Sequence, residues 1–173
     1  FTAAFREVLN RYGVRAAFYG HASVGCLHVR PMLDLRKAED VGKYRAIAEE
    51  VTELTMKFGG THSGEHGEGL ARSEFNPKVF GETLYAAFRE VKAAFDPHGR
   101  MNPGKKVDAP PMDKNLRYGA AYTTTFPVPI LDYAEFGGMD SAIEMCNGNA
   151  RCRKSEVGTM CPSYMVTLDE MHS

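Results

Sequence analysis

The sequence lacks an excess of either charge, and it lacks any long apolar run. Its 21 lysines and arginines nearly balance 22 aspartates and glutamates, which leaves a net charge of −1. Such a balance supplies no field that would attract nucleic acid or an anionic membrane surface. No apolar stretch approaches the roughly 20 residues needed to span a bilayer, and the first residues do not resemble a signal peptide. We therefore expect a cytoplasmic protein that does not bind nucleic acid.

Familiar nucleotide and zinc motifs are missing as well. There is no Gly-x-Gly-x-x-Gly fingerprint for dinucleotides and no closely spaced cysteine pair for structural zinc. Residues 99–106 partly mimic a P-loop, but Lys106 stands where a serine or threonine should bind magnesium. A nucleoside triphosphatase is therefore not expected. A turn that presents Lys105 to another phosphate-bearing ligand stays open.

The 173 residues are enough for one domain and an appendage. Apolar residues at helical spacing predict three helices, and alternating residues predict two strands between the first two helices. In chain order, the predicted elements are helix 2–12, strands 16–21 and 26–32, helix 37–58 and helix 77–95. This order predicts an α+β fold.

The last helix and the segments after it carry further signals. Asn76 and Pro77 are predicted to cap this helix and to start its first turn. An apolar stripe along the helix is predicted to face the core, and it consists of Phe80, Leu84, Ala87, Phe88, Val91 and Phe95. Prolines and glycines then predict a linker over 109–139. Three of the four cysteines follow in 140–173, which we expect to begin a second, truncated unit. Because the chain opens on Phe1 without methionine, we expect a piece of a longer protein.

The stretch 59–69 is rich in glycine and carries two histidines and two glutamates. Glycine allows the backbone to come close to a ligand, and loops on a rigid scaffold often carry catalytic groups. A mobile turn with solvated polar residues is an equal alternative. His62 and His66 have the spacing of a helical metal pair, but the surrounding glycines argue against a helix there.

A metal site is the sharpest chemical hypothesis for this loop. His21 and His28 flank the predicted strand pair, and Glu65 would add a carboxylate to their two imidazoles. Such a set binds a metal ion and leaves a position open for water or substrate. His66, with an ordinary pKa of about 6.5, is a candidate general base. From spacing alone, a metal-dependent hydrolase, a non-catalytic zinc-stabilised interaction module and ordinary surface histidines all stay open.

The cysteines of the last segment nearly match a bacterial iron–sulfur run, C-x2-C-x2-C-x3-C-P. Cys146 and Cys152 fit its first and third positions, and Cys161 precedes a proline. Asn149 stands in place of the second cysteine, and the last gap is longer than in the run. The spacing alone therefore leaves iron–sulfur, zinc and chance open.

Together, these motifs resemble one family. Four of them occur in the order known from FAD-linked oxidases, namely Tyr19-Gly20-His21 through His28, Gly60 to Gly67, Phe95-Asp96-Pro97, and Asn102 to Lys105. That family includes D-lactate, glycolate and D-2-hydroxyglutarate dehydrogenases. The resemblance implies the C-terminal half of the substrate (cap) domain over 1–108, with ferredoxin-like strands and helices. The segment 140–173 resembles the start of the helical iron–sulfur domain fused to larger bacterial members.

The resemblance also implies roles for single residues. His21, His28 and Glu65 match ligands of a divalent metal of the zinc or manganese type, and His66 matches the residue that activates the substrate hydroxyl. The FAD-binding turn would include Asn102, Gly104 and Lys105, and a 4Fe-4S cluster of the intact protein would use Cys146, Cys152 and Cys161.

The sequence departs from the family at positions that bear on the substrate. Many members read His-x-Gly-Asp-Gly-Asn-x-His, whereas this chain has Ser23, Val24 and Cys26 within that motif. Arg30 replaces the asparagine that contacts substrate in the hydroxyglutarate enzymes. Because Arg30 shares a strand face with His28, we expect it to bind a substrate carboxylate bidentately.

The function implied by the resemblance is oxidation of a small D-2-hydroxy acid of the lactate, glycolate or 2-hydroxyglutarate type. Hydride would pass to FAD, and electrons would continue to iron–sulfur clusters. The implied partners are an upstream FAD-binding domain and a downstream iron–sulfur domain of the same protein, and a homo-oligomer is compatible with this scheme. The chain alone is expected to be inactive.

Overall fold

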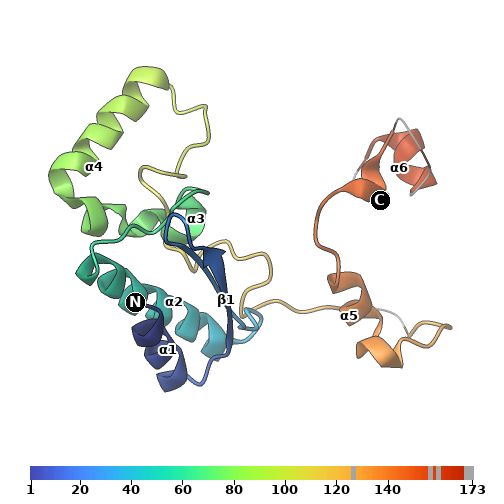
Figure 1. Ribbon diagram of the computed structural model, residues 1–173. Coiled ribbons are helices and arrows are strands. Elements are labelled where there is room, and N and C mark those ends of the chain that lie inside the picture. Colours follow the sequence, from blue (N-terminus) through green and yellow to red (C-terminus); the bar gives the residue numbers. More distant parts are fainter. Residues whose placement is uncertain (126–127, 156–157, 159–160, 170–173) are drawn as a thin grey trace. The chain divides into compact units, whose positions relative to one another are not determined.

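The computed structural model describes residues 1–125, 128–155, 158 and 161–169. The chain divides into two compact units, Phe1–Tyr122 and Thr123–Ser173. Figure 1 shows the elements of the first unit, which are α1 (Thr2–Arg11), β1 (Ala16–His21), β2 (Cys26–Pro31), α2 (Ala38–Lys57), α3 (Gly69–Arg72), the 3-10 helix η1 (Ser73–Phe75) and α4 (Asn76–Phe95). The predicted α+β class is confirmed, and the predicted elements begin and end within one residue of the observed ones.

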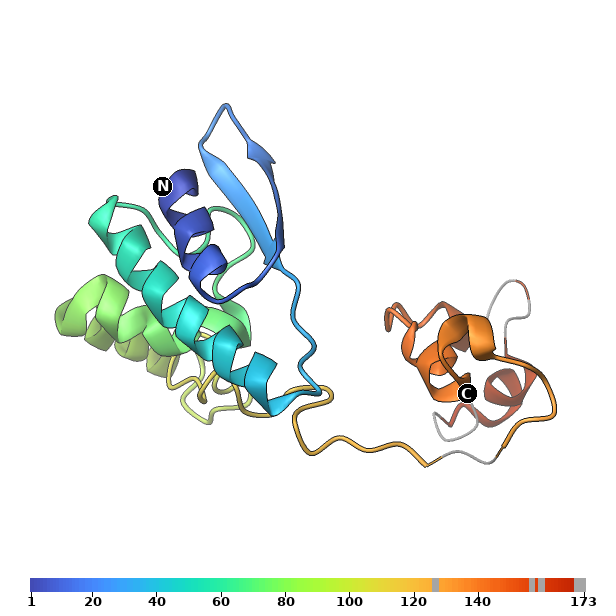
Figure 2. The ribbon, with the colours of Figure 1, turned by 90° about the horizontal axis from the view of Figure 1, so that it is seen from below.

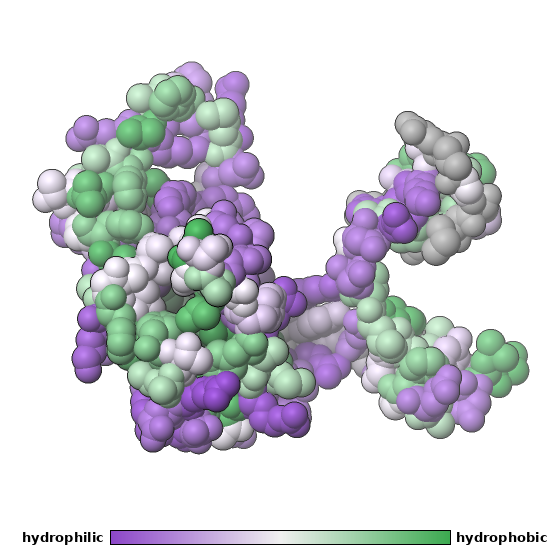
Figure 3. Space-filling model, viewed as in Figure 1, coloured by the Kyte–Doolittle hydropathy of each residue, from purple (hydrophilic) through white to green (hydrophobic). Residues whose placement is uncertain are grey.

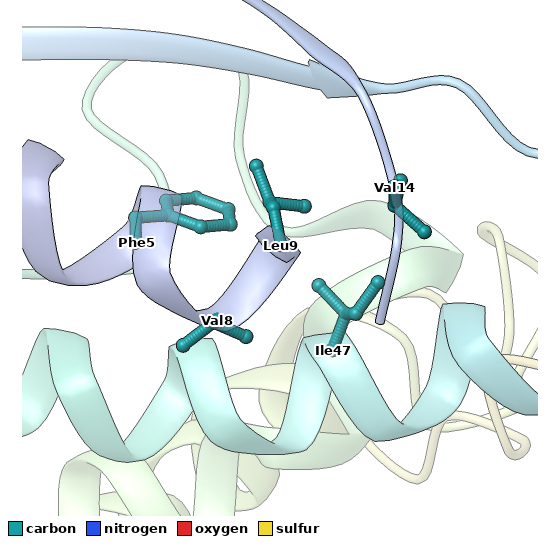
Figure 4. Packing of buried hydrophobic residues seen from close by; sticks show 5 residues of the cluster. All are labelled: Phe5, Val8, Leu9, Val14 and Ile47. Carbon is teal, nitrogen blue, oxygen red and sulfur yellow. The ribbon is translucent and has the colours of Figure 1, made fainter. Parts of the chain in front are cut away.

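The core of the first unit forms where α1 meets α2 and the hairpin. Figure 4 shows Phe5, Val8 and Leu9 of α1 together with Val14 and Ile47. All five side chains are buried, and Leu9 is only 2% exposed. In Figure 2, α1 lies between α2 and the strand pair, so its apolar residues pack against both of these elements. Burying each side chain of this size stabilises the fold by about 1.5–3 kcal/mol.

The strands β1 and β2 pair antiparallel as a two-stranded sheet. Phe18 lies opposite Val29, and both pack against the core. Tyr19 lies opposite His28, so these two belong to the other face of the sheet. The register therefore gives the hairpin an apolar face and a polar face.

Helix α4 departs from the sequence prediction in two respects. Its stripe was expected to be core, but Leu84, Val91 and Phe95 are 54%, 59% and 78% exposed. Figure 3 shows hydrophobic residues gathered over this helix. Helical spacing identifies residues that share a face, but it does not say whether a neighbouring element covers that face. The helix also contains a kink at Gly81, where φ is +77°.

The predicted helix cap at Asn76 is wrong. The 3-10 helix η1 runs directly into α4, so Asn76 already has helical backbone angles. Its side chain is fully buried, and Nδ2 donates a hydrogen bond of 3.0 Å to the carbonyl of Lys106. Asn76 therefore links α4 to the turn that follows it and does not cap the helix.

The segment that follows α4 packs against other elements of the first unit. Val107 and Met112 are both buried. The backbone N–H of Met112 donates to Glu74 at 2.7 Å, and Arg45 of α2 donates to Glu74 at 2.6 Å and to Asp113 at 3.2 Å. These bonds attach the segment to α2 and η1.

The second unit contains short helices, which are η2 (Ala134–Phe136), α5 (Met139–Glu144), η3 (Arg151–Arg153) and α6 (Pro162–Thr167). Among the described residues of 123–169, none is buried. This part of the unit therefore has no apolar core of its own. Within the described ranges of both units, no helix combines the length and the apolarity that crossing a membrane requires.

Candidate metal centre

The polar face of the hairpin carries the two histidines. His21 lies opposite Cys26 in the register, and His28 is two residues further along β2. In an antiparallel pair, such diagonal neighbours lie on one face and within reach of long side chains. The two imidazole rings meet edge to face, with their centroids 5.3 Å apart. The alternation of the strands thus brings both predicted histidines together.

The glycine-rich loop brings Glu65 to these histidines. Its Oε1 lies 2.8 Å from Nε2 of His28 and 3.7 Å from Nε2 of His21. One ligand atom from each of the three residues lies within 4.8 Å of the others, and no other such group of three occurs in the described part of the chain. Ligands about 2.1 Å from one metal ion lie roughly 3.4 Å apart, so small side-chain shifts of about 1 Å would suffice. The donor set therefore fits a divalent metal.

Two glycines permit close approaches around Cys26, Gly64 between the loop and the hairpin and Gly20 within the hairpin. A Cβ atom on Gly64 would lie 2.9 Å from Sγ of Cys26. A Cβ atom on Gly20 would lie 2.3 Å from the carbonyl oxygen of Cys26. At Gly20 a side chain would force the backbone to move, whereas at Gly64 either the Cys26 side chain or the loop would have to shift.

His66 lies beside this group. Its Nε2 is 3.3 Å from Oε1 of Glu65, and its ring centroid is 6.0 Å from that of His28. The side chain is 76% exposed, which leaves its ring accessible. The structure therefore places His66 next to the three donors, where a bound molecule could reach it.

Tyr19 and Arg30 extend the polar face. The ring of Tyr19 stacks on His28 at 4.9 Å, and the guanidinium of Arg30 lies 5.4 Å from the Tyr19 ring. Tyr19 thus lies between His28 and the Arg30 cation on the same face. Tyr19 was predicted only as part of the motif that precedes His21, although strand alternation already puts it on the face of His21.

The predicted FAD turn is held by a buried carboxylate. Asp96 accepts hydrogen bonds from Lys92 Nζ at 2.6 Å and from the backbone N–H groups of Arg100 and Met101 at 2.8 and 2.9 Å. These donors lower the pKa of Asp96 to about 2. In the turn that follows, Asn102 and Gly104 have positive φ angles of 47° and 69°, and Lys105 comes next. The role of these three residues toward FAD stays a prediction.

The described part of the second unit contains the cysteines predicted to bind a cluster. Cys146 and Cys152 are exposed and Cys161 is half-buried. Within the described residues, their sulfur atoms do not form a metal-holding group of three. The iron–sulfur assignment therefore stays a prediction.

His62 is not part of the group of three, and it lines a groove of about 760 Å³ together with Phe58 and Phe75. Both ring nitrogens are inaccessible, and neither has a hydrogen-bond partner in the described part of the chain. Its ring contacts Phe75 edge to face at 5.8 Å. Burial and then the nearby Arg72 lower the pKa of His62. The exclusion of a helical pair between His62 and His66 is confirmed, because the loop forms no helix between 59 and 68.

Comparison with known proteins identifies the family. Residues 1–106 match the family described as FAD linked oxidases, C-terminal domain. D-2-hydroxyglutarate dehydrogenase of Escherichia coli (strain K12) is 38% identical over 179 residues, which cover 100% of this chain and 17% of the relative. The enzyme of that name from Pantoea ananatis is 37% identical over 175 residues, which cover 98% and 16%. Glycolate oxidase subunit GlcD of Escherichia coli (strain K12) is 29% identical over 126 residues, which cover 73% and 25%.

The chain thus spans about a sixth of the length of the D-2-hydroxyglutarate dehydrogenases that it matches. The matched region contains the hairpin, the glycine-rich loop and the turn after α4. The chain belongs to the family of FAD linked oxidases, as a member of their C-terminal domain.

Proposed function

We propose that the chain forms part of an FAD-dependent dehydrogenase that oxidises a D-2-hydroxy acid of the lactate, glycolate or 2-hydroxyglutarate type. The observation that carries this proposal is the convergence of His21, His28 and Glu65 beside His66. The family membership and the names of the relatives support the flavin and the substrate class. A hydrolase would need no flavin, and neither the hydrolase nor the zinc-stabilised interaction module has such support.

The three donors would hold a divalent cation of the zinc or manganese type. Two imidazoles and one carboxylate leave coordination positions open, and a cation there would polarise a substrate oxygen and lower the pKa of the alcohol. Glu65 contacts both histidines, so it compensates part of the cation's charge at the centre of the group. The donors would thus fix the hydroxyl end of the substrate.

His66 and Arg30 would handle the proton and the carboxylate. His66 is exposed and lies 3.3 Å from Glu65, so its imidazole can accept the proton of a hydroxyl bound at the donors. Arg30 shares the polar face with His28, and its planar guanidinium suits a carboxylate. Stacking on Tyr19 restricts the Arg30 side chain before substrate binds. The two groups of a 2-hydroxy acid would thereby be bound on one face.

The remaining assignments concern cofactors. Bound FAD would accept the hydride, and the turn with Asn102, Gly104 and Lys105 would contact it. In the second unit, Cys146, Cys152 and Cys161 would supply some ligands of a 4Fe-4S cluster. A unit whose described residues are all accessible gains stability from a cluster, because metal binding then contributes to folding. The proposed domains are 1–108 and 140–173, joined by the linker 109–139.

A metal titration tests the centre directly. The chain is stripped with a chelator and titrated calorimetrically with Zn²⁺ and with Mn²⁺. We expect one site per chain for at least one of these ions, and its loss in His28→Ala and Glu65→Gln. His98→Ala is the matched control, because His98 is exposed and lies outside the donor group. Binding that is unaffected by His28→Ala and Glu65→Gln would contradict the assignment.

A flavin assay tests the reaction in the longer protein that carries this sequence. Anaerobic addition of D-lactate, glycolate or D-2-hydroxyglutarate should bleach the flavin absorbance. His66→Ala should slow this reduction roughly 10²–10⁴-fold while flavin stays bound, because a general base is lost. A flavin that none of these acids reduces would refute the proposed function.

A further inference from the structure

An ion pair between a buried carboxylate and a half-exposed ammonium involves the glycine-rich loop but neither the metal donors nor the general base. Glu68, three residues beyond Glu65, is only 5% exposed. Its carboxylate pairs with the ammonium of Lys106, which is 38 residues further along the chain. Burial raises the pKa of Glu68, but Lys106 and a backbone N–H lower it more, so the net pKa lies below its ordinary value. Glu68 is therefore a charged group in a buried place.

Lys106 is held at both ends by α4. Its ammonium lies 5.8 Å from the ring centroids of both Phe80 and Phe88. Its carbonyl oxygen accepts the 3.0 Å hydrogen bond from Nδ2 of Asn76, which is fully buried. These contacts fix the position of Lys106 relative to α4 independently of its ion pair with Glu68.

The loop on the other side of the pair has little stiffness of its own. Residues 60–68 form no helix or strand, and Gly67 and Gly69 on either side of Glu68 have φ angles of +72° and +58°. Glycine backbones lose much conformational freedom when they become ordered. Arg72 bonds the carbonyls of Gly67 and Glu68 at 3.1 and 3.3 Å, but it belongs to the short helix that directly follows the loop. The contact with Lys106 instead joins the loop to a distant segment.

We propose that Glu68 and Lys106 are positioning residues, whose ion pair fixes the loop so that Glu65 meets His28 and His21 before metal binds. This inference rests on the proposed function, because it assigns a role toward the same centre. Neither residue contacts the donors. Without the pair, part of the free energy of metal binding is used to order the loop, so the affinity for the metal falls.

Zinc affinity of the full chain tests the role, with Zn²⁺ alone as the probe. Glu68→Gln and Lys106→Met remove the pair from either side. Each should weaken Zn²⁺ binding roughly 10-fold or more, the effect typical of residues that orient metal ligands. The double variant should bind Zn²⁺ no more weakly than the single variant with the lower affinity, because both changes remove the same ion pair. Lys106→Arg, which keeps the charge, should recover most of the affinity.

Arg89→Met is the matched control. Arg89 pairs with Asp108 at 2.8 Å and so also ties α4 to the segment just after Lys106, but this pair is exposed and does not touch the loop. Arg89→Met should leave Zn²⁺ affinity within twofold of the wild type. A comparable loss in Arg89→Met would show that any weakening of α4 affects the site, and it would overturn the inference.

Backbone order parameters of the metal-free chain, from NMR relaxation, separate positioning from general instability. Glu68→Gln and Lys106→Met should lower the order parameters of 59–68 while those of α1 and α2 stay as in the wild type. Unchanged order parameters in the loop, or an equal decrease in α1, would overturn the positioning role. If one variant does not fold, the other decides. A wild-type chain without a Zn²⁺ site would refute the metal centre, whereas wild-type affinity in both variants would refute only the positioning pair.

Discussion

The variant Gly64→Ala should separate the loop from the hairpin. The new Cβ atom would lie 2.9 Å from Sγ of Cys26, whereas ordinary contacts begin at 3.4 Å. Either the Cys26 side chain or the loop must therefore shift by about 0.5 Å or more, and overpacking of this kind costs roughly 1–3 kcal/mol. Glu65 is the next residue, and its carboxylate is 2.8 Å from His28. Binding a metal would have to overcome the same strain, so Zn²⁺ affinity should fall about 5- to 150-fold, at about 1.4 kcal/mol for each factor of ten.

The second half of this experiment is a rescue. Cys26→Ala removes the sulfur atom that the new methyl group meets, so Gly64→Ala combined with Cys26→Ala should regain most of the affinity. Gly42→Ala is the control, because a Cβ atom at Gly42 of α2 meets nothing within 4 Å. Isothermal titration with Zn²⁺ and thermal unfolding are measured on the wild type and on these three variants. Full affinity in Gly64→Ala, or no recovery in the double variant, would refute the steric explanation.

Two further predictions concern pH. The lowered pKa of His62 means that the unfolded chain binds a proton more readily, so stability should fall as pH drops below about 6.5. His62→Phe removes two unpartnered nitrogens, so it should reduce this loss and raise the free energy of unfolding by about 1 kcal/mol at neutral pH. Urea unfolding at pH 7.5 and 5.5 measures both effects. A difference in unfolding free energy between the two pH values that equals that of the wild type would contradict this. Asp96, with its pKa lowered to about 2, contributes stability above its unfolded pKa of about 3.9, and this contribution is lost as pH falls toward 2. Asp96→Asn should lower the melting temperature at pH 7 and flatten the decline between pH 4 and 2; a melting temperature equal to that of the wild type would contradict this.

The arrangement of the histidines could be predicted from local patterns. Strand alternation has a period of two, so the sequence alone put His28 and Arg30 on one face of the second strand. The short loop between the strands fixed the register that brings His21 onto this face. The glycines around Glu65 indicated a close approach, which the contact between Gly64 and Cys26 explains.

Other features could not be predicted, because they depend on contacts between distant segments. The pairing of Glu68 with Lys106 spans 38 residues, and no local spacing reports it. Asn76 precedes a proline as a helix cap would, yet its side chain is used for a tertiary hydrogen bond to Lys106. The stripe on α4 has the period of a buried face, but Phe95 is 78% exposed. Periodicity describes one element, whereas burial requires a second.

The same strand pairing that buries the core also sets the face of the metal donors. Phe18 and Val29 are partly buried against the core cluster, and the apolar area that they bury stabilises this register. A slip of one residue would expose Val29 and turn His28 toward the core, because every side chain changes face. Packing of the apolar face thus selects the register in which His28 faces Glu65. The loop has no comparable packing, so the placement of Glu65 depends on contacts outside the strands.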